Sequence, residues 1–402
     1  MEIVSQANID VLAPTDHARS RNLTLLALAL GSFSIGTSEF ASMGIIQLFS
    51  KSLGVSIPDA TSAIAAYAFG VVIGAPLVTL AAARLNRRTL LLALMGLFIA
   101  GNVLSAMATN LGFFMVARFI SGMPQGAYFG AGAVVASYIV GPGQAGKAFA
   151  IVMTGLTVAT IVGSPLATFL GQTIGWRETY LAVAAFSLLA FGAIFQWVPR
   201  TRALDGVPII QEVSSLRKPQ VWGVMIVAAL GISSIFAVYT FIAPMVTDVV
   251  KLSPETIPVA LALFGIGMTV GNIYGGKLAD RYPARGIVLG FGSTLLILAA
   301  LALGGTHPVV FFPAMFGVGA AMMAAIPTIQ VRLTNFGPEA PSLMGAMNLA
   351  SLNVANAIGA WAGSIAVGAG YGLLSAAWAG FAVTLLGLVV FGLTLLNRLA
   401  RI

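Results

Sequence analysis

One acidic residue, Glu39, lies inside a long apolar stretch near the start of the chain. The stretch runs from about residue 23 to residue 49, and Glu39 is its only charged residue. Roughly 20 apolar residues are enough to cross the hydrocarbon of a membrane as a helix. A charged side chain there costs on the order of 2.5–3.5 kcal/mol on insertion scales, so such residues mark ion or substrate pathways. Glu39 is therefore the first candidate for chemistry, as a residue that binds and releases a proton.

Arg118 is the second charge within an apolar stretch, which runs from 112 to 139. At 1.5 Å per residue it lies about 9 Å from the outer end of its helix, and Glu39 lies about 15 Å from the outer end of its own. Two isolated charges at similar depth are expected to pair or to face one aqueous cavity. One interpretation is a proton switch, in which burial favours the neutral acid and Arg118 favours the carboxylate. The other is a fixed ion pair that holds two helices together. We favour the switch.

Polar and aromatic side chains at helical spacing are candidates for the wall of a substrate cavity. Arg118, Gln125 and Phe129 share one face of a helix, as do Glu39 and Met43. The alternative for each is ordinary packing, because small and polar residues in membrane helices often only join neighbouring helices. The predicted cavity residues are Met43, Gln47, Gln125, Tyr128, Phe129, Phe236, Tyr239, Asn353 and Asn356.

The composition of the chain is that of a polytopic membrane protein. Of its 402 residues, 58% are hydrophobic and only 8% are charged, whereas soluble proteins carry about 25% charged residues. The chain has no cysteine and two histidines, so neither thiol chemistry nor a metal site is expected. The net charge of +8 would suit nucleic acid, but the basic residues are spread over short loops. No nucleic-acid partner is therefore expected.

Twelve apolar stretches predict twelve transmembrane helices, which makes the fold class an all-α polytopic membrane protein. The stretches are 23–49, 59–82, 89–108, 112–139, 147–172, 177–198, 220–248, 256–279, 286–304, 309–331, 342–368 and 372–396. They form two groups of six around a polar segment. The expected organisation is a lead over 1–21, a bundle over 22–198, a cytoplasmic linker over 199–219, a second bundle over 220–397 and a cytoplasmic tail over 398–402.

The distribution of basic residues predicts the orientation in the membrane. With the N-terminus in the cytoplasm, sixteen of the 20 Lys and Arg residues lie on the inner side, three lie on the outer side, and Arg118 lies within a span. Inner loops of membrane proteins are enriched in Lys and Arg. We therefore expect a multi-pass protein of the bacterial inner membrane, surrounded by lipid, with both termini in the cytoplasm.

The chain also repeats itself at a spacing of 197 residues. Gly70, Gly74, Arg84 and Arg88 recur as Gly267, Gly271, Arg281 and Arg285. Each set ends the second span of its half and fills the following cytoplasmic loop. Two similar halves joined by a linker are the architecture of parallel-repeat transporters, with the substrate site between the halves. At this spacing Glu39 corresponds to Phe236, so the first half carries charge where the second offers neutral and aromatic contacts.

Three motifs of the first half are distinctive: Gly36–Phe40 followed by Met43 and Gly44, Gly74–Leu77, and Arg118–Gly122. With them the whole chain resembles the drug:proton antiporter branch of the major facilitator superfamily. It is most similar there to sugar-efflux, arabinose-efflux and chloramphenicol-resistance transporters. The resemblance implies two pseudo-symmetric six-helix bundles, a monomer, protons as the coupling ion without a cofactor, and a coupling role for Arg118.

The same resemblance assigns two further motifs. A cytoplasmic gating motif is implied at Arg84, Arg88, Gly276, Asp280, Arg281 and Arg285, and an antiporter motif at Gly155, Gly163 and Pro165. Two positions depart from the first gating motif, because Ala83 stands where the family usually has Asp and Asn86 where it usually has Gly. The antiporter motif also carries one additional residue, Ser164, before its proline.

We therefore expect a transporter that exports a small organic compound, a drug, sugar or nucleoside-like molecule, in exchange for protons. A symporter or facilitator that imports a sugar or nucleoside is the alternative within transport. A membrane receptor or scaffold without turnover is the alternative outside it. An enzyme is not expected, because Glu39 has no second acid, nucleophile or metal site near it in the sequence pattern.

Overall fold

The computed structural model describes residues 14–282 and 284–399, which form a helical membrane protein. Eleven of the described helical segments are long and apolar enough to cross a membrane. The remaining predicted span, at 112–139, is present as two consecutive helices, α5 (Leu111–Gly122) and α6 (Pro124–Val140). They are separated at Met123, before a proline that has no amide hydrogen to continue the helix. The all-α class with two sets of six crossings is confirmed over the described residues.

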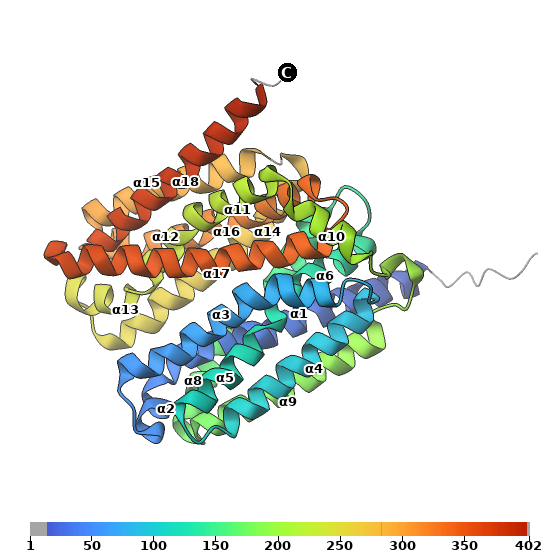
Figure 1. The fold of residues 1–402 in the computed structure, drawn as a ribbon. Helices are drawn as coiled ribbons and strands as arrows, with labels where there is room; N and C mark the ends of the chain where they lie inside the picture. Colours follow the sequence, from blue (N-terminus) through green and yellow to red (C-terminus); the bar gives the residue numbers. More distant parts are fainter. Residues whose placement is uncertain (1–13, 283, 400–402) are drawn as a thin grey trace, which may run out of the picture.

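The first half is the lower bundle in Figure 1. Its other helices are α1 (Pro14–Gly44), α2 (Ile46–Leu53), α3 (Ile57–Ala81), α4 (Arg87–Ala106), α7 (Ala145–Val158), α8 (Ser164–Thr173) and α9 (Trp176–Trp197). A π-helical turn, Ala159–Gly163, joins α7 to α8. Two predicted boundaries were wrong. The first helix begins at Pro14, within the lead expected over 1–21, and ends at Gly44 instead of continuing to 49. Residues 1–13 of that lead lie outside the described residues.

The linker and the second half follow. The linker contains a short helix, α10 (Ile209–Leu216), that the sequence analysis did not predict. The second half is the upper bundle of Figure 1. Its helices are α11 (Pro219–Gly231), α12 (Ser233–Tyr239), α13 (Ile242–Pro244), α14 (Ile257–Arg281), α15 (Arg285–Gly304), α16 (Pro308–Phe336), α17 (Pro341–Ala366) and α18 (Ser375–Leu399). Of the predicted tail, residues 400–402 lie outside the described residues.

Both halves contain the same close helix contact at the predicted spacing of 197 residues. A Cβ atom on Gly70 would lie 2.2 Å from the backbone oxygen of Phe119. A Cβ atom on Gly267 would lie 2.1 Å from the backbone oxygen of Phe316, and Phe316 is itself 197 residues after Phe119. Small residues let membrane helices approach this closely. The repeated glycine thus marks a duplicated contact, of α3 with α5 and of α14 with α16.

The two halves meet along a few helices. Helix α17 lies against α3 and α6 of the first half, and α14 lies against α7. A hydrogen bond joins the second of these contacts, because Asn272 Nδ2 donates to the backbone oxygen of Ala150 at 2.7 Å. Figure 1 shows α17 running along the boundary between the bundles. These helices position the side chains that face one half from the other.

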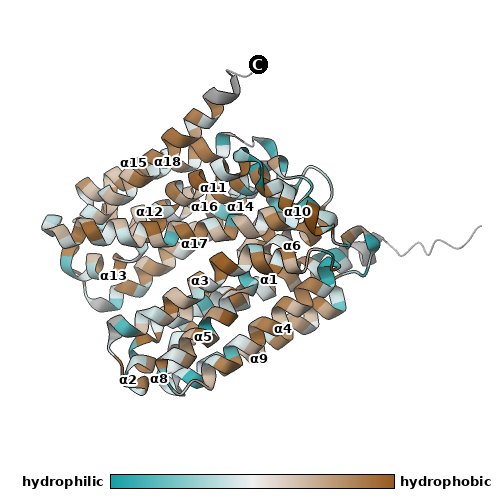
Figure 2. Cartoon of the chain, in the orientation of Figure 1, coloured by the Kyte–Doolittle hydropathy of each residue, from teal (hydrophilic) through white to brown (hydrophobic). Residues whose placement is uncertain are grey.

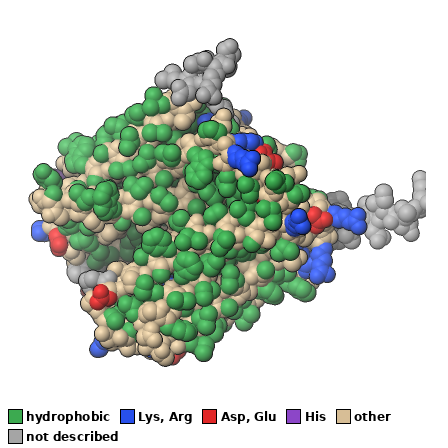
Figure 3. Space-filling model, in the orientation of Figure 1, with side chains coloured by type: hydrophobic (Ala, Val, Ile, Leu, Met, Phe, Trp, Pro, Cys, Tyr) green, Lys and Arg blue, Asp and Glu red, His purple; other side chains and the backbone are tan. Residues whose placement is uncertain are grey.

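The surface is divided into an apolar middle and two charged ends. Figure 2 shows hydrophobic residues along the middle of the bundles and hydrophilic residues toward their ends. Figure 3 shows Lys, Arg, Asp and Glu gathered at the left and right edges, with hydrophobic side chains between them. An apolar band of this kind fits the hydrocarbon of a bilayer. We call the end that carries the linker 199–219 and the turns 82–86 and 337–340 the linker end.

Candidate functional site

A cavity lined by both halves is the candidate substrate site. The cavity and its mouth together, open solvent included, hold about 620 Å³ of space free of protein atoms. The residues that line it are Glu39, Phe40, Gln125, Met153, Leu156, Thr160, Ile232, Ile235, Phe236, Tyr239, Phe264, Met268, Met323, Ile326, Leu349, Leu352, Asn353 and Asn356. Most are apolar or aromatic, and Glu39 is the one charged side chain in this lining.

Glu39 reaches the cavity from the last turns of α1. Because that helix ends at Gly44, Glu39 lies about 7.5 Å from its end, half the depth expected from an uninterrupted span. Gln125 on α6 donates a hydrogen bond from Nε2 to Glu39 Oε2 at 3.0 Å. The other amide atom, Gln125 Oε1, has no hydrogen-bond partner among the described residues. The pair combines a carboxyl that can exchange a proton with an amide oxygen that can accept a hydrogen bond.

Arg118 is buried inside the first half and does not line the cavity. Its Nη1 donates to Ser38 Oγ at 2.9 Å, and its Nη2 donates to the Ser38 backbone oxygen at 3.1 Å. The guanidinium also lies 4.5 Å from the ring centre of Tyr67 and 5.2 Å from that of Tyr180. The expected pairing with Glu39 is therefore absent from the described contacts. Ser38 and Glu39 are adjacent on α1 and point about 100° apart, so one faces Arg118 and the other faces the cavity.

The residues predicted from the antiporter motif bring α1 close to α7 beside the cavity. A Cβ atom on Gly155 would lie 2.0 Å from a backbone oxygen of α1, and one on Gly163 would lie 2.1 Å from a threonine hydroxyl of α1. Pro165 follows in the first turn of α8. Between them, the π-helical turn takes up an additional residue, as π-bulges in helices do. Thr160, in this turn, lines the cavity.

All four cavity residues predicted in the second half line the cavity: Phe236, Tyr239, Asn353 and Asn356. Tyr239 lies between two aromatic rings, with its centroid 6.5 Å from that of Phe40 and 5.3 Å from that of Phe264. The Nδ2 atom of Asn353 donates to a backbone oxygen of its own helix at 3.0 Å. The second half thus offers an aromatic surface and two amides to a ligand.

Four predicted cavity residues of the first half lie elsewhere. Gln47 belongs to α2, because α1 ends at Gly44 and the predicted continuous span is interrupted at Ile45. Met43 is exposed near the end of α1 and is not part of the lining. Tyr128 and Phe129 are fully buried in the first half, where the Tyr128 hydroxyl donates to a backbone oxygen of α1 at 3.0 Å. Packing of α6 on α1 therefore removed these two rings from the cavity.

Several lining residues were not predicted, chiefly methionines and aliphatic residues. Met153, Met268 and Met323 line the cavity, although their types read as ordinary packing in the sequence. The internal repeat could have identified one of the unpredicted residues, Leu156. It lies 197 residues before Asn353, and both line the cavity. The internal repeat thus relates two pairs of lining positions, 39 with 236 and 156 with 353, and no other pair in this lining.

The predicted gating residues lie at the linker end, where Asp280 makes a contact between the halves. Its Oδ1 accepts a hydrogen bond from the Gly146 amide at 2.7 Å, and its Oδ2 accepts one from the Lys147 amide at 3.0 Å. These amides belong to the first turn of α7. Gly276 lies one turn earlier on α14, where a Cβ atom would be 2.7 Å from the side chain of Ala150. Here the second half closes against the first.

The gating arginines make fewer contacts between the halves. Arg88 donates to the backbone oxygen of Phe195 and lies 5.1 Å from the centre of its ring, entirely within the first half. Arg84, Arg281 and Arg285 are exposed. The structure thus brings Asp280 and Gly276 together with α7. Arg88 is instead buried within the first half, and the other three gating arginines are exposed.

Comparisons with known proteins agree with this architecture. The family model described as Major Facilitator Superfamily matches residues 28–360 and 238–401. The chain is 38% identical to the inner membrane transport protein YdhP of Escherichia coli strain K12, over 93% of this chain and 95% of that one. It is 33% identical to a chloramphenicol resistance protein of Streptomyces lividans, over 92% of this chain and 95% of that one.

A solved structure shares the fold at low sequence identity. The transporter FucP, crystallised in an outward conformation, superposes with a TM-score of 0.72 at 14% identity, over 93% of this chain and 99% of that one. Fold, cavity position and sequence relatives lead to one classification. The chain belongs to the Major Facilitator Superfamily, a family of membrane transporters and not of enzymes.

Proposed function

We propose that this transporter exports a small organic compound in exchange for protons, by opening the central cavity alternately to each side of the membrane. The observation that carries the proposal is the Glu39 carboxyl on the cavity wall, held by Gln125 amid apolar residues. A carboxylate is costly in such surroundings unless a positive or hydrogen-bonding group compensates it. Glu39 therefore binds a proton when the cavity is empty and releases it when a suitable ligand arrives.

Arg118 acts in this scheme at a distance from the cavity. It binds both the hydroxyl and the backbone oxygen of Ser38, the residue before Glu39. Its positive charge favours the ionised form of a nearby carboxyl, and its two hydrogen bonds tie the helix segment that carries Glu39. We assign Arg118 as a positioning residue that sets how readily Glu39 loses its proton.

Relatives support the direction and the location. One of them is named for chloramphenicol resistance and another as an inner membrane transport protein, so we propose export across the bacterial inner membrane. The excess of basic residues at the linker end supports cytoplasmic termini. We propose that protons are the coupling ion and that no cofactor takes part. We also propose that the protein functions as a monomer in the lipid bilayer, without a nucleic-acid partner.

Import of a sugar or nucleoside by symport is the second candidate. The observation that favours it is the neutral wall of the second half, where Asn353 and Asn356 offer amides to a hydroxyl-rich solute. Export and import differ in one measurable property, the direction in which protons move relative to the solute.

The test uses proteoliposomes loaded with a pH-sensitive dye and a panel of sugars, nucleosides and amphenicols added outside. Proton movement opposite to the solute is expected from the wild type and is expected to vanish in Glu39→Gln. Proton movement in the same direction as the solute would establish the symporter. Solute flux without proton movement would make Glu39 structural and the protein a facilitator. Binding without any flux would indicate a receptor.

A further inference from the structure

Asp280 of the second half closes the linker end against the first half. Asp280 places its carboxylate on the first turn of α7, at the amides of Gly146 and Lys147. A carboxylate is favourable at a helix N-terminus because the first amide groups there lack partners and carry partial positive charge. This single side chain thus joins α14 of the second half to α7 of the first.

The corresponding contact in the first half has no carboxylate of its own. At the spacing of 197 residues, Asp280 corresponds to Ala83, and Gly146 corresponds to Leu343 in the first turn of α17. Helix α17 lies against α3, as α7 lies against α14. The two contacts between the halves therefore use equivalent pairs of helices. The residue that caps α17 is Ala340, which has no side chain to accept a hydrogen bond from its amides.

The linker brings a carboxylate to this place. Glu212 of α10 is fully buried, and its Oε1 accepts a hydrogen bond from Arg87 Nη2 at 3.2 Å. Arg87 is also buried, and its Nη1 donates to the backbone oxygen of Ala83 at 3.3 Å. Burial raises the pKa of the Glu212 carboxyl, and the Arg87 guanidinium and the Leu343 amide oppose that rise. The other carboxyl oxygen, Glu212 Oε2, is buried and makes no hydrogen bond among the described residues. Helix α10 nevertheless lies close to the start of α17, because a Cβ atom on Gly337 would lie 3.1 Å from Ser215 of α10 and 2.8 Å from Met344 of α17.

The start of the linker is bound to the same turn of the first half. Asn86 Nδ2 donates to the backbone oxygen of Thr201 at 2.9 Å and to Asp205 Oδ1 at 2.7 Å. Gly206 packs so closely on Ala83 that a Cβ atom there would lie 1.9 Å from the Ala83 backbone oxygen. Both positions where the first gating loop departs from its expected motif, Ala83 and Asn86, are thus in contact with the linker.

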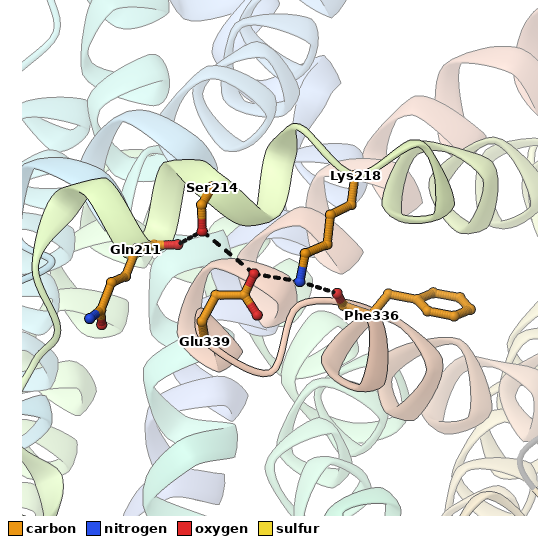
Figure 4. Close-up of polar contacts among 5 residues, drawn as sticks. All are labelled: Gln211, Ser214, Lys218, Phe336 and Glu339. Carbon is orange, nitrogen blue, oxygen red and sulfur yellow. Dashed lines mark hydrogen bonds and ion pairs between the residues drawn. The ribbon is translucent and has the colours of Figure 1, made fainter.

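The end of the linker is bound to the second half. Lys218 Nζ lies 2.5 Å from Glu339 Oε1 and donates to the backbone oxygen of Phe336 at 3.0 Å. Ser214 Oγ donates to Glu339 at 3.5 Å and to the backbone oxygen of Gln211 at 2.7 Å. Figure 4 shows these side chains meeting between the linker and the turn that precedes α17. The linker therefore crosses from one half to the other at this end.

We propose that Glu212 is a gating residue, supplied by the linker in place of the carboxylate that the first half lacks at position 83. It binds Arg87 of α4 and faces the N-terminus of α17, so the two halves separate at the linker end only when Glu212 leaves one of these partners. The inference rests on the proposed transport cycle, because the gate matters only if the halves move apart.

The experiment exploits a chain that contains no cysteine. Ser342→Cys places one thiol in the first turn of α17, at a fully buried position next to Leu343. The full-length protein in nanodiscs is treated with a water-soluble maleimide, and the rate of alkylation reports opening at the linker end. Glu212→Ala is expected to raise that rate on the order of tenfold, the size of a typical coupling between sites.

Two further variants make the result specific. Gln211→Ala, an exposed neighbour on the same helix, is the matched control and should leave the rate unchanged. Ala83→Asp in the Glu212→Ala background should restore slow alkylation, because it supplies the carboxylate as Asp280 does in the other half. If Glu212→Ala alone does not fold, the double variant is compared with the wild type, and rapid alkylation of the folded double variant would overturn the proposal.

An unchanged rate in Glu212→Ala, or an equal increase in Gln211→Ala, would also overturn it. The solute-exchange assay separates this outcome from failure of the proposed function. Glu212 lies outside the cavity lining, so Glu212→Ala should alter the maximum exchange rate and leave the KM for solute unchanged. A gate that opens normally in a protein without proton exchange would contradict the antiport proposal and leave the role of Glu212 intact.

Discussion

The two halves present different chemistry to one cavity from equivalent backbone positions. Glu39 and Phe236 are 197 residues apart and both line the cavity, as do Leu156 and Asn353. The contacts that hold each half together did not diverge in this way, since Gly70 and Gly267 meet their neighbouring helices almost identically. A duplicated scaffold can thus keep its helix packing while its cavity residues change. One half became the charged wall and the other the neutral wall.

Equivalent positions of the two halves also differ at the linker end. Asp280 joins the halves on one side through a residue of the repeat itself. On the other side the repeat position is Ala83, and the carboxyl comes from Glu212 of the linker. A linker that supplies part of a gate does more than connect the two halves. Its loss should change how readily the halves separate at the linker end.

The largest expected effect comes from a substitution that removes the charge difference between the two cavity walls. Glu39→Gln removes the charge from the first-half wall and should lower proton-driven exchange by roughly 100-fold, the lower range for losing a positioned acid or base. Phe236→Leu changes the equivalent position of the second half and should raise the KM for solute while protons remain coupled. Both are measured by lumenal pH and solute uptake. Equal loss of coupling in the two variants would contradict the assignment of charge chemistry to one wall.

Arg118→Met makes the first half resemble the second, because Met315 is the equivalent buried residue. Removing a buried cation also removes the cost of its desolvation, so the unfolding free energy should change by less than about 2 kcal/mol. Proton-driven exchange should nevertheless fall by about tenfold, because the charge no longer favours ionised Glu39. Thermal unfolding and the liposome assay are compared. A large loss of stability with coupling intact would make Arg118 purely structural.

Substitution of the repeated glycines tests the shared scaffold. Gly70→Ala and Gly267→Ala each force a Cβ atom against a backbone oxygen and should each destabilise the protein by roughly 1–3 kcal/mol. Gly96→Ala is the control, because a Cβ atom there would meet nothing within 4 Å. Thermal unfolding in detergent measures all three. Unequal effects of the first two would show that the duplicated contacts are no longer equivalent.

The smallest effect concerns the contact of the linker with the second half. Lys218, by its hydrogen bond, holds the pKa of Glu339 below its usual range, and the side chains are 39% and 26% exposed. Such a surface pair is worth about 0–1 kcal/mol. Because the pKa is lowered in the folded state, this stabilisation is present above the ordinary carboxyl pKa of about 4.3 and is lost as the pH falls below it. The difference in melting temperature between wild type and Glu339→Gln should therefore shrink in acid. A constant difference would assign the effect to packing.

Much of the architecture could be predicted because membrane insertion is decided by local composition. Apolar stretches of sufficient length must form helices in a bilayer, whatever they pack against. The same argument made Glu39 conspicuous, since a charge in such a stretch needs a reason to be there. The internal repeat added the two-bundle organisation and related Glu39 to Phe236, and both residues line the cavity.

The partners of these residues were decided by tertiary structure. Helical periodicity tells which side chains share a face, but it does not tell which distant helix packs on that face. Gln125 was therefore placed in the cavity wall without its bond to Glu39, Arg118 was expected beside Glu39 instead of Ser38, and Tyr128 was not recognised as core.

The linker shows the same limit most clearly. By sequence alone, residues 199–219 were a polar connection, and Ala83 was a defect in a motif. Only the fold, by bringing α10 against Arg87 and the start of α17, placed the Glu212 carboxyl where that motif lacks one. The sequence by itself determined the helices, their division into halves and the charge in the cavity. The tertiary structure decided the partners of each charge, because those contacts join residues up to 134 positions apart and depend on how whole helices pack.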